Sequence, residues 1–496
     1  MSDGSKPATS TPRPDLDVVP ARYREHVVDL FDTWAAVRAR NAALRSYVEM
    51  KQATKDLGIS IPPDLVKVNT VVGWADKAMR VRAVRSKFQG FVFEGEQDRR
   101  LDALVRRNRL ASKYSMAVRG ALTYGCAAMT VMRGATRRQP PVMVRGFSAN
   151  QCVMLWDKDE DAIGCGLAVV GVDREGVASR YVLHEPDAVV TLWRDDDDYA
   201  WECLVEPHPM GRPLMVPLVH DADDDRPLGH SVITPEVMGI IDKAMRDVLR
   251  MEVGAEFFTA PQRYILGADP DLFGYDQVRD AVEGDADDED DAPEPQRPVD
   301  PRKMMRAYLG AILALTRDTN GELPQVGQFA PGDAGNFIAV FENDAQRFSG
   351  ATNVPLGQLG VLSNTYTSSD ALGAANDPLI LDVEALNVRM GESMEEVARL
   401  MMALDAGVGY DRLDDRQMGV IAQFADPAQP TISATADAWT KIGAADQSLV
   451  GTRVWYEGLG LSKATIDRIM AAREQQTTTA MLGEIAQLVG GDLQNG

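Results

Sequence analysis

Histidines and cysteines are the side chains of this sequence best suited to proton transfer or metal binding, and their spacing matches no established motif. No H-E-x-x-H pair occurs, and no two cysteines form the C-x-x-C pair of a zinc site. We therefore interpret the histidines as structural or surface residues, and we expect no metal and no cofactor. The five histidines are His26, His184, His208, His220 and His230.

Short glycine patterns resemble parts of catalytic or phosphate-binding loops but are incomplete. Gly164-Cys-Gly166 and Gly458-Leu-Gly460 do not complete G-x-G-x-x-G, and no G-x-x-x-x-G-K-[ST] loop occurs. Gly229-His-Ser231 begins like a nucleophile elbow, but Ile233 stands where the second glycine is required. We expect turns at these glycines, and we expect Ser231 to begin a helix.

Three aspartate-rich runs, at 195–198, 221–225 and 285–291, offer carboxylates for Mg²⁺. Metal sites that act on phosphates usually draw their carboxylates from separate rigid elements, whereas these acids are consecutive in turn-like segments. We interpret the runs as solvated loops and expect no enzyme. A metal-dependent nuclease that uses these aspartates remains an alternative, although no histidine or lysine accompanies them in a suitable arrangement.

Length and charge narrow the class of protein further. With 496 residues, of which 45% are hydrophobic, the chain can hold several cores. The formal net charge of −22 opposes tight binding to the phosphate backbone of nucleic acid, but it permits DNA to slide past. The unpaired cysteines favour a reducing cytoplasm, and every apolar stretch is shorter than the roughly 20 residues of a membrane-spanning helix.

The elements that would position any site alternate between helical and strand-like patterns. The first 20 residues are rich in Ser, Thr, Pro and Asp, which predicts a disordered arm. Apolar residues then recur at spacings of three and four to about Arg133, which predicts helices. Short β-rich runs with acidic or glycine-containing turns between residues 140 and 220 predict an antiparallel meander.

The second half of the sequence reads as long helices separated by polar segments. Thr234 as N-cap and Pro235 at the first helical position predict a helix to about Thr259. Strand-like runs and an acidic insert at 280–298 follow, and a second helix is expected from about 331 to 348. After a polar stretch at 350–376, helicity resumes at 378–404 and again at 413–489.

Several short motifs occur in an order that points to one family. The most specific runs from Asp225-Arg-Pro-Leu-Gly-His-Ser231 through Ile241-Asp-Lys-Ala-Met-Arg246 to Ala260-Pro-Gln-Arg263. Together the motifs resemble siphovirus-type portal proteins of the kind common in actinobacteriophages, from about residue 21 to 475. The other motifs are Val68-Asn-Thr-Val-Val-Gly-Trp74 with a turn at Gly90-Phe91, Asn108-Arg-Leu110, Ala121-Leu-Thr-Tyr-Gly125, Gly327-Gln-Phe329, Asn353-Val-Pro355, Ser368-Ser-Asp-Ala371 and Phe424-Ala-Asp-Pro427.

The resemblance implies an α+β portal subunit fold built from named parts. After the arm at 1–20, a wing at 21–231 leads into a first stem helix at 232–259. A clip with the acidic insert occupies 260–330, and a second stem helix occupies 331–349. A tunnel loop at 350–376 and a long wing helix at 377–405 follow, and a helical crown and C-terminal tail complete the chain at 406–496.

The resemblance also implies a role at the portal vertex of the capsid, in the virion and, during assembly, in the host cytoplasm. The expected partners are identical subunits in a dodecameric ring, double-stranded DNA bound without sequence specificity, terminase, the major capsid and scaffolding proteins, and head-completion or adaptor proteins, with no membrane. Another structural virion protein, such as a minor capsid or connector subunit, is the alternative. The expected tunnel-loop residues are Gln358, Asn364, Thr365, Tyr366, Thr367, Ser368 and Ser369, and the expected docking residues of the clip are Asp285, Asp287, Asp288, Glu289, Asp290 and Asp291.

Overall fold

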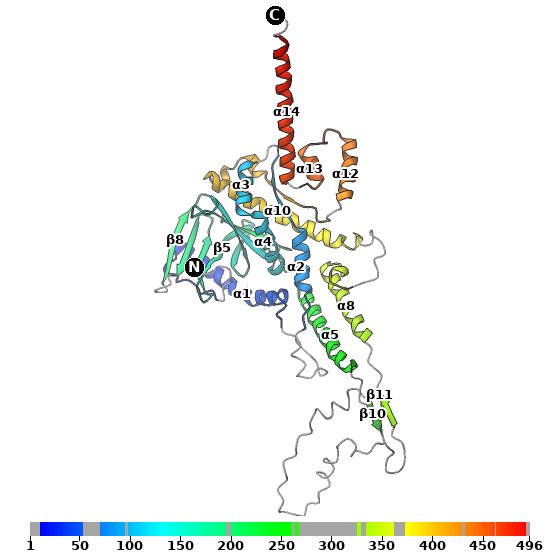
Figure 1. Ribbon diagram of the computed structural model, residues 1–496. Helices are drawn as coiled ribbons and strands as arrows, with labels where there is room; N and C mark the ends of the chain where they lie inside the picture. Colours follow the sequence, from blue (N-terminus) through cyan, green and yellow to red (C-terminus); the bar gives the residue numbers. More distant parts are fainter. Residues whose placement is uncertain are drawn as a thin grey trace, which may run out of the picture.

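A computed structural model describes residues 10–52, 70–94, 98–194, 200–259, 263–266, 325–328, 334–361, 373–428, 432–461 and 463–492. A central body combines helices with β-sheets (Figure 1). The helices α5 and α8 leave the body on one side, and the C-terminal helix α14 leaves it on the opposite side. The predicted α+β class is confirmed.

A five-stranded antiparallel sheet forms one half of the body and confirms the predicted meander for residues 152–207, whereas the strand-like runs at 142–148 and 215–219 belong to a second sheet. Its strands follow chain order: β4 (Cys152–Asp157), β5 (Ala162–Val172), β6 (Ala178–His184), β7 (Ala188–Arg194) and β8 (Trp201–Pro207). After the 3-10 turn η1 (Ala21–Tyr23), helix α1 (Arg24–Val48) places Val27, Leu30 and Trp34 in the core that it shares with this sheet. Because these positions lie three and four residues apart, they form one apolar stripe on the helix.

Residues 10–20 pack against this sheet, so the prediction of a disordered arm is wrong for them. Ser10 forms a parallel bridge with Val177, and the Tyr181 hydroxyl donates to the Pro12 carbonyl oxygen at 2.8 Å. Val19 is almost fully buried in the core beneath α1. The composition of the segment suggested disorder, but its few apolar residues cover the margin of a core that local sequence does not reveal. Residues 1–9 lie outside the described part.

The other half of the body surrounds a three-stranded sheet in the order β3 (Val142–Ser148), β2 (Cys126–Arg133) and β9 (Met215–Val219). Helices α2 (Trp74–Arg85), α3 (Arg99–Asn108) and α4 (Leu110–Tyr124) contribute to the same core. The largely helical pattern expected to about Arg133 ends earlier, because α4 ends at Gly125, whose φ of 100° favours glycine, and the chain then enters β2 as the resemblance of Ala121-Leu-Thr-Tyr-Gly125 to a helix leading into a strand implies. Beyond this residue the chain pairs on both sides as a central strand.

A two-stranded pairing joins distant parts of the sequence and was not predicted. Strand β1 (Phe88–Val92) pairs antiparallel with β12 (Ile421–Phe424), so Gly90-Phe91 is part of a strand and not a turn. Phe88 contacts the ring of Phe424 with the centroids 5.8 Å apart. Part of the region after residue 406, which was expected to be helical, is therefore a strand that belongs to the body.

The three long helices expected in the second half are confirmed. They are α5 (Pro235–Thr259), α8 (Ala334–Thr352) and α10 (Asp377–Ala406), and the 3-10 turn η4 (Leu356–Gln358) follows α8. The Thr234 hydroxyl accepts from the Val237 amide at 3.3 Å, as expected of an N-cap. Gly407 ends α10 in the left-handed conformation with φ 73°. Between α5 and α8 the strands β10 (Arg263–Leu266) and β11 (Gln325–Gln328) pair antiparallel.

Three short elements connect α10 to the C-terminal helices within the described residues: η5 (Tyr410–Arg412), α11 (Asp415–Met418) and β12. The C-terminal helices are α12 (Ile432–Ala445), α13 (Arg453–Gly458) and α14 (Lys463–Asp492). The rings of Trp439 on α12 and Trp455 on α13 meet edge to face at 5.7 Å. Within the described residues, no helix is long and apolar enough to cross a membrane.

Candidate functional site

The paired helices α5 and α8 hold their most polar contact inside the pair. Lys243 of α5 donates to both carboxylate oxygens of Asp344 on α8, at 2.6 and 2.7 Å, and to Asp247 at 2.9 Å. Asp344 is fully buried, and Arg250 binds the other oxygen of Asp247 at 2.8 Å. Burial raises the pKa of Asp344, although the hydrogen bonds from Lys243 oppose the rise. The Lys243 ammonium group thus bridges the two carboxylates, Arg250 supplies the second positive charge, and the contact with Asp344 joins α5 to α8.

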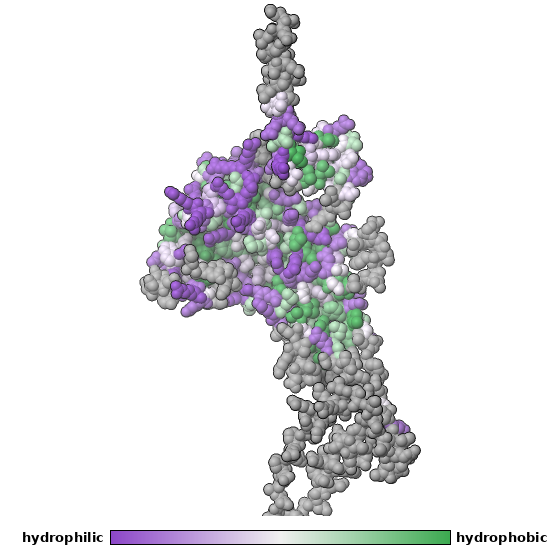
Figure 2. Space-filling view, viewed as in Figure 1, coloured by the Kyte–Doolittle hydropathy of each residue, from purple (hydrophilic) through white to green (hydrophobic). Residues whose placement is uncertain are grey.

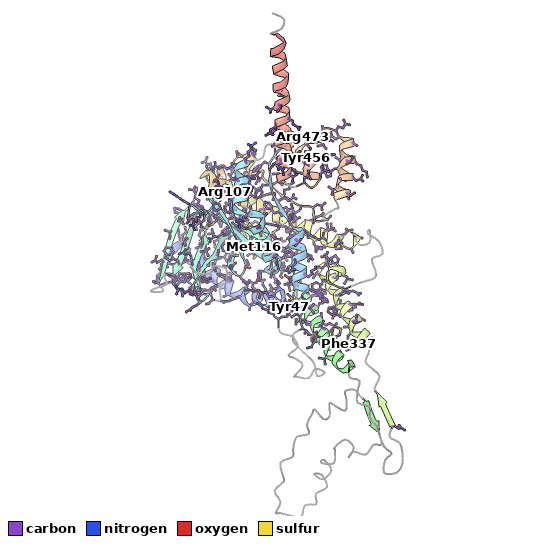
Figure 3. The ribbon with its side chains drawn as sticks, viewed as in Figure 1. Tyr47, Arg107, Met116, Phe337, Tyr456 and Arg473 are labelled. Atoms are coloured by element: carbon purple, nitrogen blue, oxygen red, sulfur yellow. The ribbon has the colours of Figure 1, made fainter. Side chains whose placement is uncertain are left out.

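Two contacts anchor the helix pair to the body. The Tyr47 hydroxyl at the end of α1 donates to Asp242 of α5, at 2.9 and 2.8 Å from its two carboxylate oxygens. The Trp74 ring of α2 lies 5.1 Å from the ring of Phe341 and 5.4 Å from that of Phe348, both on α8. Figure 3 shows Tyr47 where the pair leaves the body and Phe337 further along α8.

The C-terminal end of α8 meets α2 and α10 at a buried arginine. Arg82 of α2 binds Asp382 of α10 at 2.9 Å and donates to the carbonyl oxygen of Thr352, the last residue of α8. Asn353, with φ 52°, donates to both oxygens of Asp382 at 3.1 Å. A cleft of about 280 Å³ opens beside this junction, and Arg389 and His220 also line it. The junction fixes the place at which the polar segment after α8 begins.

The polar segment at 350–376 is held together at its two ends. Gln358, expected in the tunnel loop, is half-buried and donates to the side-chain oxygen of Asn376 at 3.2 Å. Arg85 of α2 donates to the same oxygen at 3.4 Å. The structure therefore brings Gln358 and the last residue of the segment, Asn376, together beside α2. The other expected tunnel-loop residues, Asn364, Thr365, Tyr366, Thr367, Ser368 and Ser369, lie outside the described residues, as do the expected clip residues at 285–291.

Several large apolar side chains of α8 and α10 lie on the surface of the single chain. Ile338 and Val340 of α8 are 50% and 42% exposed, and Leu381 and Val388 of α10 are 63% and 65% exposed. Figure 2 shows apolar residues gathered over α5 and α8 where the pair joins the body. Single exposed apolar residues are ordinary, so these four are of interest only because they recur on two long helices.

Gly229 and Ser231 have structural roles in the backbone that leads into α5. A side chain at Gly229, whose φ is 74°, would place its Cβ 2.2 Å from the carbonyl oxygen of His220. The Ser231 hydroxyl donates to the Thr123 carbonyl oxygen at 2.6 Å and accepts from the Ile233 amide at 2.9 Å. Ser231 therefore ties the end of α4 to the segment that leads into α5, but the helix itself begins at Pro235 with Thr234 as its N-cap.

The histidines lie in three places: His184 near His208, His220 beside His230, and His26 opposite Glu185. Burial, with a smaller effect of His208, lowers the pKa of His184 to about 3, and neither ring nitrogen of His184 has a hydrogen-bond partner among the described residues. His220 and His230 bind backbone carbonyl oxygens at 2.7 and 2.9 Å. His26 instead faces the buried carboxylate of Glu185. Sequence spacing could not reveal this contact, because the two residues lie in different elements.

Comparison with known proteins gives one consistent result. Residues 30–450 match the model of the family described as "Phage portal protein, SPP1 Gp6-like". The portal protein of Mycobacterium phage D29 is 25% identical over 488 residues, which cover 95% of this chain and 92% of the relative. The portal protein of Mycobacterium phage L5 is 25% identical over 455 residues, which cover 89% and 86%.

Solved structures from the necks of gene transfer agent particles are also similar. A chain from the neck of an empty particle, computed with C6 symmetry, has a TM-score of 0.43 at 11% identity and covers 85% of this chain and 93% of its own length. A chain from the neck of a native particle, computed with C12 symmetry, has a TM-score of 0.41 at 14% identity and covers 84% and 99%.

Proposed function

The chain belongs to the SPP1 Gp6-like family of phage portal proteins, and on this premise we propose that its copies form a dodecameric ring at the portal vertex of the capsid. Double-stranded DNA enters the capsid through this ring during packaging and leaves through it during ejection. The family match over residues 30–450 is the observation that carries the proposal. The family is a structural one, and we assign no catalytic step to the chain.

Apolar residues on α8 and α10 support the ring. Ile338, Leu381 and Val388 are at least half exposed in the single chain, on two neighbouring helices. A contact between two different faces of identical subunits closes into a ring when the rotation between subunits permits it. In this proposal the neighbouring copy covers these residues, and the interface holds the helix pairs around the central channel.

The segment at 350–376 is the proposed tunnel loop. It contains no lysine or arginine, and its polar groups at Gln358 and 364–369 are neutral. Each phosphate that a basic residue neutralises adds a salt-dependent affinity with a slope of about −0.9, which neutral groups do not contribute. Weak contacts of this kind leave DNA free to slide. The hydrogen bond between Gln358 and Asn376 supports the proposal because it closes the part of the loop between residues 358 and 376.

The remaining partners follow from the same premise. We assign terminase docking to the clip, with Asp285, Asp287, Asp288, Glu289, Asp290 and Asp291 as the docking residues. The ring also contacts the major capsid, scaffolding and head-completion proteins. In this scheme the protein assembles in the host cytoplasm and remains in the virion.

Electron microscopy of the purified chain, together with native mass spectrometry, tests the ring. Wild-type protein should give rings with a central hole wide enough for duplex DNA. Ile338→Lys and Val388→Lys should reduce the ring population, because each buries a charge in the interface. Leu204→Lys is the matched control, since Leu204 is equally exposed but lies on the sheet strand β8. A wild-type chain that stays monomeric at all concentrations and salt conditions contradicts the proposal.

A packaging assay tests the tunnel loop separately. Replacing Asn364 and Thr365 with lysine should leave ring formation intact and slow DNA translocation, most strongly at low salt. Replacing the same residues with serine is the matched control and should leave translocation unchanged. If the lysine variant packages DNA at the wild-type rate at low salt, the proposal that this loop faces DNA in the channel is wrong.

A further inference from the structure

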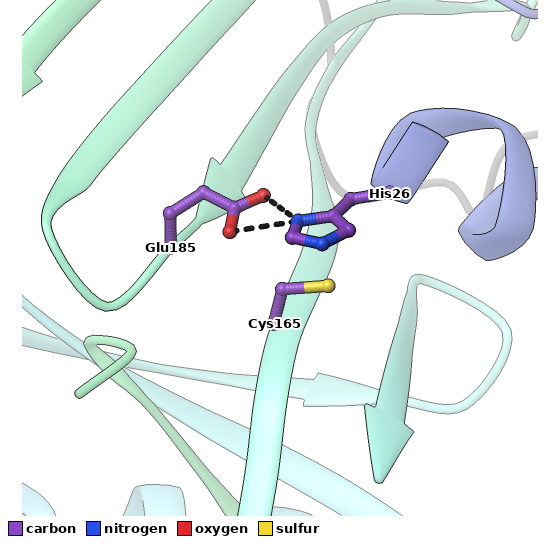
Figure 4. A group of neighbouring side chains, drawn as sticks. All are labelled: His26, Cys165 and Glu185. Carbon is purple, nitrogen blue, oxygen red and sulfur yellow. Dashed lines mark hydrogen bonds and ion pairs between the residues drawn. The ribbon is translucent and has the colours of Figure 1, made fainter. Parts of the chain in front are cut away.

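Three metal-binding side chains from separate elements meet between α1 and the five-stranded sheet. They are His26 of α1, Cys165 of β5 and Glu185, in the turn between β6 and β7 (Figure 4). One nitrogen, the sulfur and one carboxylate oxygen all lie within 4.8 Å of one another. We propose that this triad binds one transition metal ion of the zinc class, which ties α1 to the sheet. The proposal is independent of ring formation.

The sulfur, nitrogen and oxygen donors of the triad favour zinc over Mg²⁺ and Ca²⁺. Zinc is commonly bound by thiolate, imidazole and carboxylate groups, whereas Mg²⁺ and Ca²⁺ require mainly oxygen donors. Three protein ligands leave a fourth position for water. Glu185 has a side-chain exposure of 2%, and Cys165 is buried, but the side chain of His26 is 45% exposed. The site is therefore enclosed on the sheet side and accessible to an ion from the side of His26.

The surrounding charges favour a cation. His26 Nδ1 lies 2.9 and 3.0 Å from the two oxygens of Glu185, a hydrogen bond that holds two of the donors together. Asp187 lies near Glu185, and Asp29 lies near Cys165. Arg22 is the nearby cation, and it binds Asp187 at 2.9 Å. A metal ion would balance the excess of carboxylates around the buried Glu185.

The thiol must lose its proton when a metal binds. Burial raises the pKa of the Cys165 thiol, and Glu185 and Asp29 raise it further. Without a cation, Cys165 therefore stays protonated. Metal binding replaces the sulfur–hydrogen bond with a sulfur–metal bond and releases the proton to solvent, so the affinity should fall as the pH falls.

Metal titration of the untagged full-length chain tests the site after treatment with a chelator. Co²⁺ should bind with one ion per chain and produce a thiolate-to-cobalt charge-transfer absorption band, and Zn²⁺ should displace it. Cys165→Ser should abolish the band and weaken Zn²⁺ binding by more than about tenfold. Cys203→Ser is the matched control, because Cys203 is a half-buried thiol on β8 of the same sheet.

A second readout separates metal binding from an ordinary His–Glu hydrogen bond. Zn²⁺ should raise the melting temperature of the wild-type chain and of Cys203→Ser, but not that of Cys165→Ala, which keeps a small apolar side chain in the core. Circular dichroism establishes that the variants are folded. If Co²⁺ gives no charge-transfer band, or if the band survives in Cys165→Ser, the proposal is overturned and the triad is only a hydrogen-bonded pair beside a buried thiol.

Discussion

The α1–sheet half of the body and the α5–α8 helix pair differ in how they hold their buried polar groups. Beneath α1 most core side chains are apolar, such as Leu30 and Tyr181, the fully buried His184 is neutral, and the buried Glu185 faces the partly exposed His26. Inside the helix pair the buried Asp344 is paired with Lys243, whereas Ile338 and Val340 of α8 are exposed. In the proposed ring a neighbouring copy covers these exposed residues, whereas the apolar core beneath α1 forms within one chain.

The largest expected effect comes from a substitution in the apolar core between α1 and the sheet. Leu30→Ala removes a fully buried side chain between α1 and the sheet and should lower the free energy of unfolding by about 2 to 5 kcal/mol. Chemical unfolding followed by tryptophan fluorescence measures the change. Val37→Ala, on the same helix but only partly buried, is the control and should cost less. Equal losses at both positions would show that the two sites do not differ in packing.

The next effect concerns the ion pair inside the helix pair. Lys243→Met leaves the buried Asp344 carboxylate without its ammonium partner and should cost about 2 to 3 kcal/mol. The double variant Lys243→Met with Asp344→Leu removes both charges and should recover much of the loss. Thermal and chemical unfolding of the three proteins complete the comparison. A double variant as unstable as Lys243→Met would mean that the buried charge is not the cause.

Acid should weaken the sheet half through His184. Its folded-state pKa of about 3 lies below the ordinary value of 6.5, so protonation favours the unfolded chain. The contribution of the neutral His184 imidazole to the free energy of unfolding is therefore fully present above pH 6.5 and decreases as the pH falls towards 3. At pH 5 the loss should be about 2 kcal/mol.

His184→Leu should remove that acid dependence. Unfolding free energies measured at pH 8 and pH 5 should differ by about 2 kcal/mol less in His184→Leu than in the wild-type chain. The measurement at pH 8, where the imidazole is neutral in both states, corrects for the change in packing. An unchanged pH dependence would show that His184 is not the group that titrates.

The smallest effect on folding should come from the exposed residues of the helix pair. Ile338→Lys changes a half-exposed side chain and should alter the free energy of unfolding of the dissociated chain by no more than about 0.5 kcal/mol. The same variant should nevertheless reduce ring formation. Unfolding measured below the assembly concentration, beside native mass spectrometry above it, separates the two effects. A large loss of stability in the monomer would place Ile338 in the core of the chain itself.

Local sequence patterns predicted the elements more reliably than their contacts. Thr234 and Pro235 marked the start of α5, and apolar periodicity located α8 and α10. These signals could be found because an N-cap and an amphipathic stripe depend only on residues that are close together in the sequence. The pairing of β1 with β12 was missed because a strand of four or five residues carries a weak pattern and its partner lies far along the chain.

In the candidate site, too, the elements could be predicted from the sequence but the contacts between them could not. The polar stretch at 350–376, which lacks lysine and arginine, was visible in the sequence, but the hydrogen bond that joins Gln358 to Asn376 was not. Lys243 and Asp344 each looked like an ordinary helix residue until the packing of α5 against α8 brought them together. Their pairing depends on the register of two helices, which no local pattern specifies.

The order of the motifs identified the family, and local patterns predicted the α+β class, the long helices and most of the meander. The covering of the sheet by residues 10–20 and the meeting of His26, Cys165 and Glu185 became visible only in the folded chain. The two kinds of feature differ in how far apart their residues lie along the chain. Periodicity and capping act between residues a few positions apart, whereas the meeting of three elements depends on how the whole intervening chain packs around a shared core.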